Sequence, residues 1–375
     1  MKFIKEITVF SIGDANDLKT WSNVPYFFTK NLEEKNIKVN RVNIEENPIL
    51  NFLYKYSIFI LLKIINKNSN HTFFRSRLNY FLTNQKIKKA IKDYSKADAL
   101  LFLTYSFSAP KQHNKKVILF SDWSYLYYIH TFLKREPVWF EKQALRNKEK
   151  HINEADIVLS LFPKSHEFNL QHYKNKHQYY LGNVINANYK LNKAEIISKK
   201  TNSHKLLFIG NSKYLQGAID LINAFKELKT NAELHIIGLT ANEIGVNTQH
   251  VFYHGYLDKG ISVENELYYQ LIIESKAIIN TNPDWGAFSA MTEAMYYFTP
   301  VITSPYEEFT KTYGIDINFG FYVPHNSRNE LTQKLEEILS NTDDNYLNLM
   351  NNAHEKVKEF TWSSYTDKVL KLINE

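Results

Sequence analysis

Short apolar runs alternate with amphipathic stretches along the whole chain. The first run, residues 7–12, predicts a buried strand, and turn residues follow it at 13–17. Residues 24–34 then predict a helix, with Asn23 able to cap it and Pro25 allowed in its first turn. Similar runs predict further strands at 37–42, 99–104, 116–120 and 157–161. The helical stretches between them are typical of a mostly parallel sheet.

The alternation restarts after a polar stretch at residues 186–204, where we expect the domain boundary. Predicted strands follow at 205–210, 233–238, 250–253 and 277–280, with helices at 217–228 and 264–275. Residues 346–375 have a helical pattern with a break near residue 360, where Thr361 or Ser363 could cap the last helix. The predicted fold class is α/β, with two sheets in series that are each covered by helices.

The composition indicates a globular protein with more than one core, because the chain has 375 residues and 44% hydrophobic side chains. The sequence contains no Cys, which removes disulfide and thiolate chemistry and favours a reducing compartment. Metal ligands would have to be His or carboxylates. Charged residues interrupt the apolar positions of the first ten residues, unlike a secretory signal, so we expect a cytoplasmic protein.

The formal net charge of +7 favours anionic partners, which could be nucleic acid, a membrane surface or a phosphorylated small molecule. An AT-rich genome, which enriches Asn, Lys and Tyr, would explain the same charge without any function. Nucleic-acid binding has no further support, because the sequence shows no helix-turn-helix, zinc or aromatic-sheet motif.

The segment 277–303 carries the most chemical information. An apolar run, a loop with Gly286, a helix start near Glu293 and a second apolar run follow one another. In an α/β sheet, free backbone N–H groups at such a helix start can hold a phosphate, and a carboxylate on the first turns can accept two ribose hydroxyls. The alternative is structural, because Glu near a helix N-terminus is also favoured by the helix dipole.

Residues 50–65 are markedly apolar, but Lys55 and Lys63 interrupt them and the stretch is too short to cross a bilayer. Basic residues follow among aromatic and aliphatic ones: Arg75, Arg77, Lys86, Lys88, Lys89 and Lys92. An apolar face beside a basic one is typical of a helix that lies on an anionic membrane. An ordinary helix packed on the N-terminal sheet would show the same amphipathicity.

Several motifs follow one another in the second half of the chain: Lys205-Leu-Leu-Phe-Ile-Gly210, the helix from Gly217 to Leu228, Ala232-Glu-Leu-His-Ile-Ile-Gly238, His254-Gly255, and the stretch from Gly286 through Glu293-Ala-Met to Ile302. In order and spacing they resemble family 4 glycosyltransferases. The first-strand loop, residues 13–26, is similar to one bacterial branch of that family, and Phe360-Thr-Trp362 before a terminal helix also fits. The matches together cover most of the chain.

This resemblance implies the GT-B fold, with two Rossmann-like domains that face a cleft. The first would span residues 1–190 and approach the acceptor, the second would span 200–358 and bind a nucleotide-diphosphate sugar, and a helix at 359–375 would cross back to the first. The resemblance also implies a retaining transfer with no required metal. The product would be a bacterial surface polysaccharide (lipopolysaccharide, O-antigen or capsule), built on a glycan or lipid-linked acceptor.

The family's donor-site roles fall on particular residues of this sequence. Glu293 corresponds to the carboxylate that holds the ribose, and Gly13 would let the first-strand loop approach the phosphates. The remaining donor-side candidates are Asn211, Lys213, Tyr256 and Leu257, the last two beside the base, and Gly286, Ala287, Phe288 and Ser289, whose amides would face the sugar and the distal phosphate. Packing of loops and helices is the alternative explanation for each of these residues.

Two departures from the family pattern bear on catalysis. Trp285 stands where the earlier Glu of the family's pair is expected, with Asp284 beside it, and we take both as catalytic candidates. Leu215 and Gln216 stand where an Arg and a Lys usually neutralise the diphosphate, which leaves Lys213 as the nearest cation. The ring at 285 could stack on a sugar or base.

On the acceptor side, Asp122 ends an apolar strand at the edge where α/β sheets bind ligands, and it is a further catalytic candidate. Trp21, Ser22, Tyr26 and His130 are candidates for the same side. Helix capping for Asp122 and core packing for the aromatic residues are the structural alternatives. A nucleotide-sugar epimerase of the same fold, or a binding subunit that has lost activity through Trp285, Leu215 and Gln216, are the rival functions.

Overall fold

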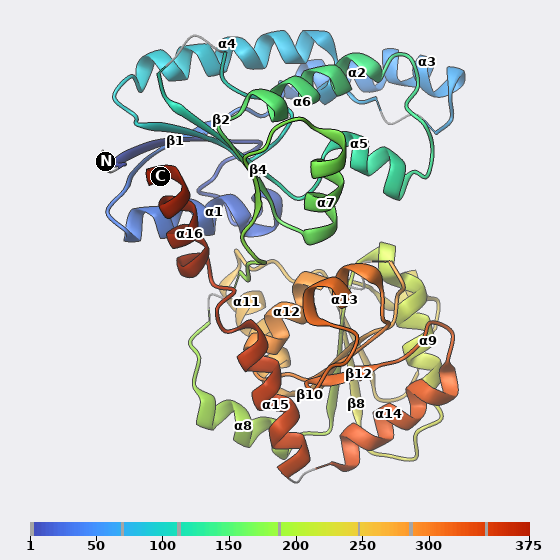
Figure 1. Cartoon of the computed structure of the whole chain (residues 1–375). Helices are drawn as coiled ribbons and strands as arrows, with labels where there is room; N and C mark the ends of the chain where they lie inside the picture. The colour runs from blue at the N-terminus through green and yellow to red at the C-terminus, as the bar shows by residue number, and fades with distance from the viewer. Residues whose placement is uncertain are drawn as a thin grey trace. The chain divides into compact units, whose positions relative to one another are not determined.

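The computed structural model describes residues 4–68, 71–110, 114–186, 189–246, 248–284, 288–341 and 344–375. The chain divides into two compact units. Unit 1 comprises Met1–Asn183 and Trp362–Glu375, and unit 2 comprises Val184–Thr361. The sequence placed the corresponding boundaries at 190–200 and 358–359. Figure 1 shows the helices and strands of each unit.

Unit 1 is built on a six-stranded parallel sheet with the order β2-β1-β3-β4-β5-β6. Its strands are β1 (Glu6–Ser11), β2 (Lys38–Asn43), β3 (Ala99–Phe102), β4 (Lys116–Ser121), β5 (Ile157–Ser160) and β6 (Gln178–Tyr180). The order of strands reverses between β1 and β3. In open α/β sheets, ligands bind beyond the carboxyl ends of the strands at such a reversal.

The apolar runs of the sequence become the central strands of this sheet. Every residue of β3 and β5 is buried, as expected for parallel strands that are covered on both faces. The rings of Phe10 and Phe102 stack across the β1–β3 pair with centroids 4.4 Å apart. The five predicted strands are confirmed, but β6 was not predicted, because its three residues Gln178–Tyr180 form no apolar run.

The helices of unit 1 are α1 (Val24–Glu34), α2 (Pro48–Lys55), α3 (Ile58–Ile65), α4 (Arg77–Asp93), α5 (Tyr125–Tyr127), α6 (Lys142–Glu154), α7 (Pro163–His172) and α16 (Trp362–Asn374). Helix α1 has the predicted bounds, with Pro25 in its first turn. The predicted cap by Asn23 is wrong. Asn23 has a left-handed backbone, and its amide group donates to the Leu18 carbonyl instead of accepting from the helix.

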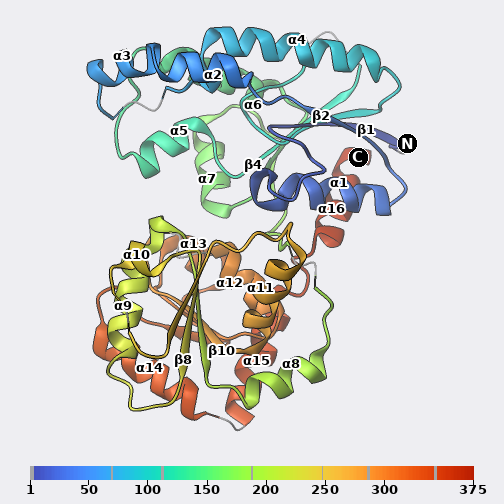
Figure 2. The same ribbon diagram turned by 180° about the vertical axis from the view of Figure 1, so that it is seen from behind.

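The C-terminal helix α16 belongs to unit 1, as the resemblance implied. It packs against α1, where the ring of Phe28 lies 5.2 Å from that of Trp362 and 6.0 Å from that of Tyr365. Both views of the ribbon show α16 beside α1 (Figures 1 and 2). These buried rings tie the end of the chain to its beginning, since aromatic pairs at such distances add to the free energy gained by burial.

Unit 2 has a second six-stranded parallel sheet, with the order β12-β11-β10-β7-β8-β9. Its strands are β7 (Lys205–Ile209), β8 (Glu233–Ile237), β9 (Val251–Gly255), β10 (Ser275–Asn280), β11 (Val301–Thr303) and β12 (Gly320–Tyr322). The order of strands reverses between β7 and β10. The ends of these two strands therefore mark the expected ligand position in unit 2.

The helices of unit 2 are α8 (Lys193–Thr201), α9 (Leu215–Phe225), α10 (Ala241–Ile244), α11 (Ser262–Glu274), α12 (Phe288–Tyr296), α13 (Glu307–Tyr313), α14 (Arg328–Ser340) and α15 (Asp344–Val357). Helix α8 lies within the polar stretch that we expected to be a boundary. Its Lys200 is fully buried, and the ammonium group donates to the carbonyls of Ile272 and Ser275 and to the hydroxyl of Thr299. Because its residues are mostly polar, α8 was not predicted from the sequence, although it packs in unit 2.

No single helix among the described residues is both long and apolar enough to cross a membrane. Helices α2 and α3 meet the criterion only when taken together as a pair bent by 40°. Both lie on the α4 side of unit 1 in the two views (Figures 1 and 2).

Candidate active site

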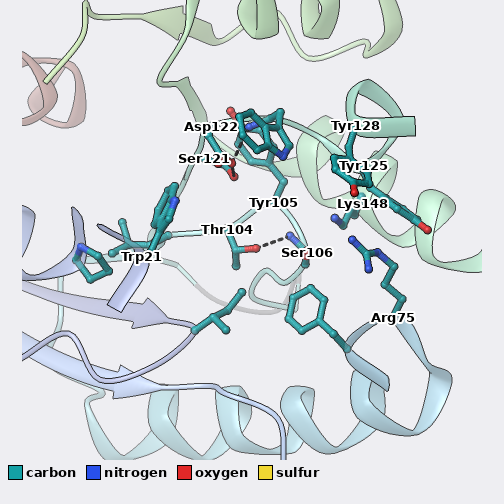
Figure 3. Close-up of a pocket in the computed structure, with 15 residues that line it drawn as sticks. Trp21, Arg75, Thr104, Tyr105, Ser106, Ser121, Asp122, Tyr125, Tyr128 and Lys148 are labelled. Carbon is teal, nitrogen blue, oxygen red and sulfur yellow. Dashed lines mark hydrogen bonds between the residues drawn. The ribbon is translucent and has the colours of Figure 1, made fainter. Parts of the chain in front are cut away.

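Unit 1 contains a pocket of about 440 Å³ at the carboxyl ends of its central strands (Figure 3). Ile12 follows β1, residues 103–106 follow β3, and Ser121, Asp122 and Trp123 stand at the end of β4. The pocket therefore lies where the strand order reverses, which is the ligand position expected for this type of sheet. Its volume falls within the range of small-molecule sites.

Asp122, the predicted catalytic candidate, lines this pocket. Its Oδ1 accepts hydrogen bonds from the Trp123 amide at 2.8 Å and the Ser121 hydroxyl at 3.1 Å. Burial raises the pKa of this carboxyl, although the two hydrogen bonds oppose that shift. A carboxylate held in this way can accept a hydrogen bond or a proton from a ligand hydroxyl.

Trp21 also lines the pocket, and its backbone conformation is unusual. Trp21, Ser22 and Asn23 have consecutive positive φ angles of 37°, 51° and 69°. Left-handed conformations are costly for residues with a side chain, and they cluster at functional sites. Here the turn brings the Trp21 indole against Phe120, with ring centroids 5.6 Å apart, at the wall of the pocket.

Three acceptor-side candidates do not line this pocket. Tyr26 is not among the pocket-lining residues, and its ring packs edge-on against Phe27. His130 belongs to the short π-helical segment Tyr128–Phe132 and packs against the rings of Phe168 and His172 on α7. Ser22 follows Trp21 in the left-handed turn but does not line the pocket. The structure thus brings together Asp122 and Trp21 alone from the predicted acceptor set.

Sequence reasoning missed two cations of this pocket, Arg75 and Lys148. The guanidinium of Arg75 lies 4.2 Å from the ring centroid of Tyr125, and the ammonium of Lys148 lies 5.0 Å from the same centroid. Figure 3 shows both groups pointing toward one another beside that ring. In the sequence Arg75 belongs to a basic run that is typical either of a membrane-facing helix or of an ordinary helix packed on the sheet, whereas in the structure it is half-buried and lines the pocket.

Gly13 has a structural explanation in the turn after β1. Its φ of 97° is a conformation that L side chains rarely adopt, and a Cβ there would stand 3.0 Å from the side chain of Thr20. Its amide donates to Asn43 Oδ1 at 3.1 Å, and its carbonyl accepts from the Ser11 hydroxyl at 2.7 Å. The contact of Gly13 with donor phosphates stays a prediction.

In unit 2, Glu293 is buried in the second turn of α12, with 5% of its surface exposed. Both of its oxygens have partners. The ammonium of Lys259 donates to both Oε1 and Oε2, at 2.8 Å each. The hydroxyl of Tyr269 donates to Oε1 at 2.8 Å and that of Tyr268 donates to Oε2 at 2.9 Å.

This arrangement raises the pKa of both tyrosines, first because they are buried and then because the Glu293 charge lies beside them. Charge-assisted hydrogen bonds of this kind are stronger than those between neutral groups. A ligand with two adjacent hydroxyls could bind Glu293 only by taking the place of one of its present donors. Lys259 is the donor nearest to solvent, with 15% of its side chain exposed.

Most other donor-side candidates lie on loops or in the core of unit 2. Tyr256 is 76% exposed after β9, with Leu257 half-buried beside it. Asn211 accepts from the Lys213 amide at 3.1 Å and so caps the short turn Ser212–Tyr214, which leaves the Lys213 side chain exposed. Phe288 packs in the core against Phe309 and Tyr313.

The loop between β10 and α12 is described only in part. Asp284 is exposed, and its amide donates to Asn282 Oδ1 at 2.9 Å. Ser289 is exposed in the first turn of α12. Trp285, Gly286 and Ala287, which include the departure from the family pattern, lie outside the described residues.

Asn280, at the end of β10, has an unusual environment. It is fully buried, its Oδ1 accepts from the Asn282 amide at 3.1 Å, and its Nδ2 has no hydrogen-bond partner among the described residues. A Cβ on Gly217 of α9 would stand 2.9 Å from that Oδ1, so only glycine fits there without a shift. An unpaired buried donor is costly and calls for an explanation.

Residues 190–358 match the family model of the glycosyl transferases, group 1. The chain carries a group 1 glycosyl transferase domain. No curated protein matches the chain by sequence.

Solved structures agree with this family in fold. Sucrose-phosphate synthase from Thermosynechococcus elongatus superposes with a TM-score of 0.66 at 15% identity, over 99% of this chain and 98% of that chain. HepE from Anabaena, solved in complex with UDP and glucose, gives 0.61 at 14% identity over 99% and 100%. WaaG, a glycosyltransferase involved in lipopolysaccharide biosynthesis, gives 0.62 at 13% identity over 98% and 99%. The chain has the GT-B fold.

In this glycosyl transferase domain, sequence reasoning missed Lys259, Tyr268, Tyr269 and Asn280 as neighbours of the predicted site. Lys259 stands two residues after Leu257, and that proximity is the one available signal. The two tyrosines stand at adjacent positions in a helix whose sequence gives no sign that both face a carboxylate. Within the described ranges, no group of three or more His, Asp or Glu residues is placed to hold a metal ion.

Proposed function

We propose that this protein is a retaining glycosyltransferase that acts in bacterial surface polysaccharide synthesis, with lipopolysaccharide, O-antigen or capsule as the product class. Unit 2 would bind a nucleotide-diphosphate sugar, and the pocket of unit 1 would bind a glycan or lipid-linked acceptor. The observation that carries the proposal is the family match over residues 190–358. The similarity to HepE, solved with UDP and glucose, and to WaaG, which is involved in lipopolysaccharide biosynthesis, supports the substrate class.

The donor would bind at the end of the unit 2 sheet, beside α12. Glu293 would accept the two ribose hydroxyls once Lys259 moves from the carboxylate, since both groups are joined by hydrogen bonds at present. The displaced ammonium would then be available to the diphosphate. That cation would partly offset the lack of basic residues at Leu215 and Gln216.

Transfer would need no metal ion. In a front-face retaining mechanism the departing phosphate can accept the acceptor's proton, so stabilisation of the leaving diphosphate by cations and amides is the main requirement. Chelation with EDTA should therefore leave the rate of transfer unchanged. Loss of activity that Mg²⁺ or Mn²⁺ restores would contradict this part of the proposal.

An anionic membrane surface would hold the enzyme near a lipid-linked acceptor. Helix α3 has no buried residue, although seven of its eight side chains are Ile, Leu or Phe. The apolar patch comprises Ile49, Phe52, Leu53, Tyr56, Ile58, Ile60, Leu61, Ile64 and Ile65, each at least 47% exposed. The basic residues Arg77, Lys86, Lys88, Lys89 and Lys92 are exposed on α4. Apolar burial combined with attraction to anionic headgroups is how such helices bind bilayers.

The deciding experiment is a thermal-shift panel with UDP-, GDP-, ADP- and CMP-linked sugars, followed by a transfer assay with the sugar that stabilises the chain. A ligand that binds only the folded state raises the apparent stability. We expect one nucleotide class to raise the Tm and its sugar to appear on material from bacterial membranes. Stabilisation by none of the four classes would refute a nucleotide-sugar enzyme. A changed sugar without acceptor would indicate an epimerase, and binding without transfer a degenerate subunit.

A further inference from the structure

The buried lysines of the chain differ in what their side-chain nitrogen contacts. Lys200, on α8, donates to two carbonyls and a hydroxyl. Lys276, on β10, donates to the carbonyls of Leu339 and Asn341. The fold thus supplies acceptors for both nitrogens, as it usually does for buried polar groups. Lys148, on α6, does not share this arrangement.

The side-chain nitrogen of Lys148 faces the unit 1 pocket. It lies 5.0 Å from the ring centroid of Tyr125, and it makes no hydrogen bond or ion pair with any residue that the structure describes. The guanidinium of Arg75 lies 4.2 Å from the same centroid (Figure 3). A ligand in the cavity can therefore reach this nitrogen without displacing a hydrogen-bond partner of Lys148.

The surroundings of Lys148 favour the neutral amine. Its pKa is held well below its ordinary value, first by burial and then by the positive charge of Arg75, while the charge of Asp122 opposes the shift. Arginine does not lose its proton in proteins, so the amine is the group that does. A neutral amine has a free lone pair and is a nucleophile. Lysines become nucleophiles in this way when they lie in an apolar pocket or next to another cation.

The cavity has room for a small ligand beside this amine. Its volume is about 440 Å³, and Trp21, Trp123 and Tyr128 line it with flat apolar faces. Asp122 lines the same cavity and offers an acceptor for hydroxyl groups. A short hydroxylated carbon chain can therefore pack on the rings while its reactive group meets Lys148. Aromatic walls with a few convergent polar groups are the usual form of a small-molecule site.

We propose that Lys148 is a nucleophilic lysine that binds carbonyl compounds covalently, with a small aldose or ketose in its open-chain form as the ligand. The lone pair of the amine attacks the carbonyl carbon and a C–N bond forms. The two protons of the amine leave with the carbonyl oxygen as water, so the product is an imine that hydrolysis reverses. This inference stands on the unit 1 geometry alone and goes beyond the proposed function, because glycosyl transfer needs no such bond.

Reductive trapping of the full-length chain at pH 7 tests the site. The probes are glyceraldehyde, its ketone isomer dihydroxyacetone, and glycerol, which has no carbonyl group. Sodium cyanoborohydride reduces an imine to a stable secondary amine, and mass spectrometry of peptides assigns the label to one lysine.

Lys150 is the internal reference, because it is exposed on the same helix. We expect at least one carbonyl probe to label Lys148 about tenfold or more faster than Lys150, since each unit by which a pKa is lowered gives about tenfold more neutral amine. The two carbonyl probes distinguish an aldehyde site from a ketone site, and glycerol should give no label. Labelling of Lys148 no faster than Lys150 with both carbonyl probes would overturn the proposal.

The concentration dependence separates a binding site from reactivity alone. We expect the labelling rate of Lys148 to saturate as the probe concentration rises, because the ligand occupies the pocket before it reacts. The rate at Lys150 should rise in proportion to concentration over the same range. A proportional rise at Lys148 as well would refute a binding site in the pocket.

Lys200 controls for opening of the chain. Burial lowers its pKa too, but its nitrogen is held by acceptors of the fold, so it should stay unlabelled. Labelling of Lys200 at the rate of Lys148 would show that local unfolding causes the reaction, which would overturn the proposal.

Two variants test the contribution of Arg75. Arg75→Gln removes the neighbouring charge and should slow the labelling of Lys148 by about threefold or more, because a like charge lowers the pKa of an amine. Arg75→Lys keeps a charge and should retain the fast reaction. The rate at Lys150 and the Tm show whether either variant disturbs the fold. An unchanged rate at Lys148 in a folded Arg75→Gln would contradict activation by Arg75.

The outcomes separate this inference from the proposed function. Stabilisation by a nucleotide sugar without selective labelling of Lys148 would leave the transferase proposal intact and refute the nucleophilic lysine. Selective, saturable labelling without stabilisation by any nucleotide sugar would do the reverse.

Discussion

The two units place charged groups at equivalent edges of similar sheets but treat the charges in opposite ways. In unit 1, Arg75 and Lys148 face a cavity and each other (Figure 3). In unit 2, Glu293 is enclosed by Lys259, Tyr268 and Tyr269, which satisfy both carboxylate oxygens. A cavity in which two cationic side chains lie near one another becomes electrostatically more favourable when a ligand of opposite sign enters. A site with matched charge has to exchange partners before a ligand can bind.

This difference predicts where each unit gains its stability. Removing Lys148 from the unit 1 pocket relieves its repulsion with Arg75 and breaks no hydrogen bond to any residue that the structure describes. Removing the carboxylate from unit 2 leaves an ammonium and two hydroxyls without their acceptor. Breaking a buried charged cluster by deleting one partner is strongly destabilising, because the remaining groups stay desolvated.

The largest expected effect is therefore in unit 2. Glu293→Ala should lower the free energy of unfolding by about 3–5 kcal/mol, the range for breaking a buried ion pair. Chemical denaturation monitored by circular dichroism measures this change. Glu266→Ala is the matched control, because Glu266 is exposed on α11. If Glu293→Ala is as stable as the control, the cluster does not stabilise unit 2 and the contrast between the units is lost.

The unit 1 edge should be sensitive to acid. His151 lies on α6, three residues after Lys148, and burial lowers its pKa to about 4. The Nε2 atom of its ring forms a hydrogen bond with the Tyr80 hydroxyl at 3.0 Å. His151 gains a proton near pH 6.5 in the unfolded chain, but in the folded chain it stays neutral down to about pH 4. The stability that depends on neutral His151 is therefore fully present above pH 6.5. It falls as the pH drops toward 4, by about 3 kcal/mol in total.

Hydrogen exchange of β4 peptides between pH 4 and pH 7, corrected for intrinsic rates, measures this loss in unit 1. His151→Gln keeps a polar side chain without the titration, and its stability should change less across the same range. An equal pH dependence in wild type and variant would show that other groups cause the acid sensitivity.

The exposed apolar patch of unit 1 offers a third contrast. Replacing Leu61 and Ile64 with Asp should reduce binding to vesicles that contain anionic lipid by about 3 kcal/mol or more, since each buried aliphatic side chain contributes about 1.5–3 kcal/mol. Co-sedimentation measures the partition. The Tm should stay unchanged, because α3 has no buried residue. A lowered Tm would indicate that the patch packs within the protein and does not face lipid.

The smallest effect concerns Lys259. If the Lys259 ammonium leaves Glu293 and then binds the diphosphate, Lys259→Met should weaken nucleoside diphosphate binding by a factor of about 3–10, the equivalent of one modest hydrogen bond. Calorimetric titration measures the Kd. Lys226→Met, an exposed position just after α9, is the control. Tighter binding in Lys259→Met would show instead that this ammonium only blocks the carboxylate and does not contact the diphosphate.

The sequence predicted the strands well, because parallel strands buried on both faces are continuous apolar runs, as at β3 and β5. It also predicted the bounds of α1. It placed Asp122 and Trp21 on the same side of the site, and both line one pocket. It failed where a polar side chain has an inward role. Lys200 marks α8 as a packed helix, yet in the sequence it belongs to a polar stretch that resembles a linker.

The site partners missed by the sequence share one cause. Arg75, Lys148 and Asp122 stand on three separate segments, and only the crossover connections of the sheet bring them to one edge. Likewise Lys259, Tyr268 and Glu293 come from a loop and two helices. The sequence pattern of one element does not predict contacts between side chains of separate elements. Periodicity indicates which face of a helix or strand is buried, but not which other element packs against that face.

The central claim is that unit 2 binds an activated sugar through Glu293 in the second turn of α12. Hydrogen–deuterium exchange with the stabilising nucleotide sugar tests it most directly. We expect slower exchange in peptides that cover Phe288–Tyr296 and residues 256–260, and loss of that protection in Glu293→Gln. Protection confined to unit 1, or identical protection in Glu293→Gln, would contradict the claim.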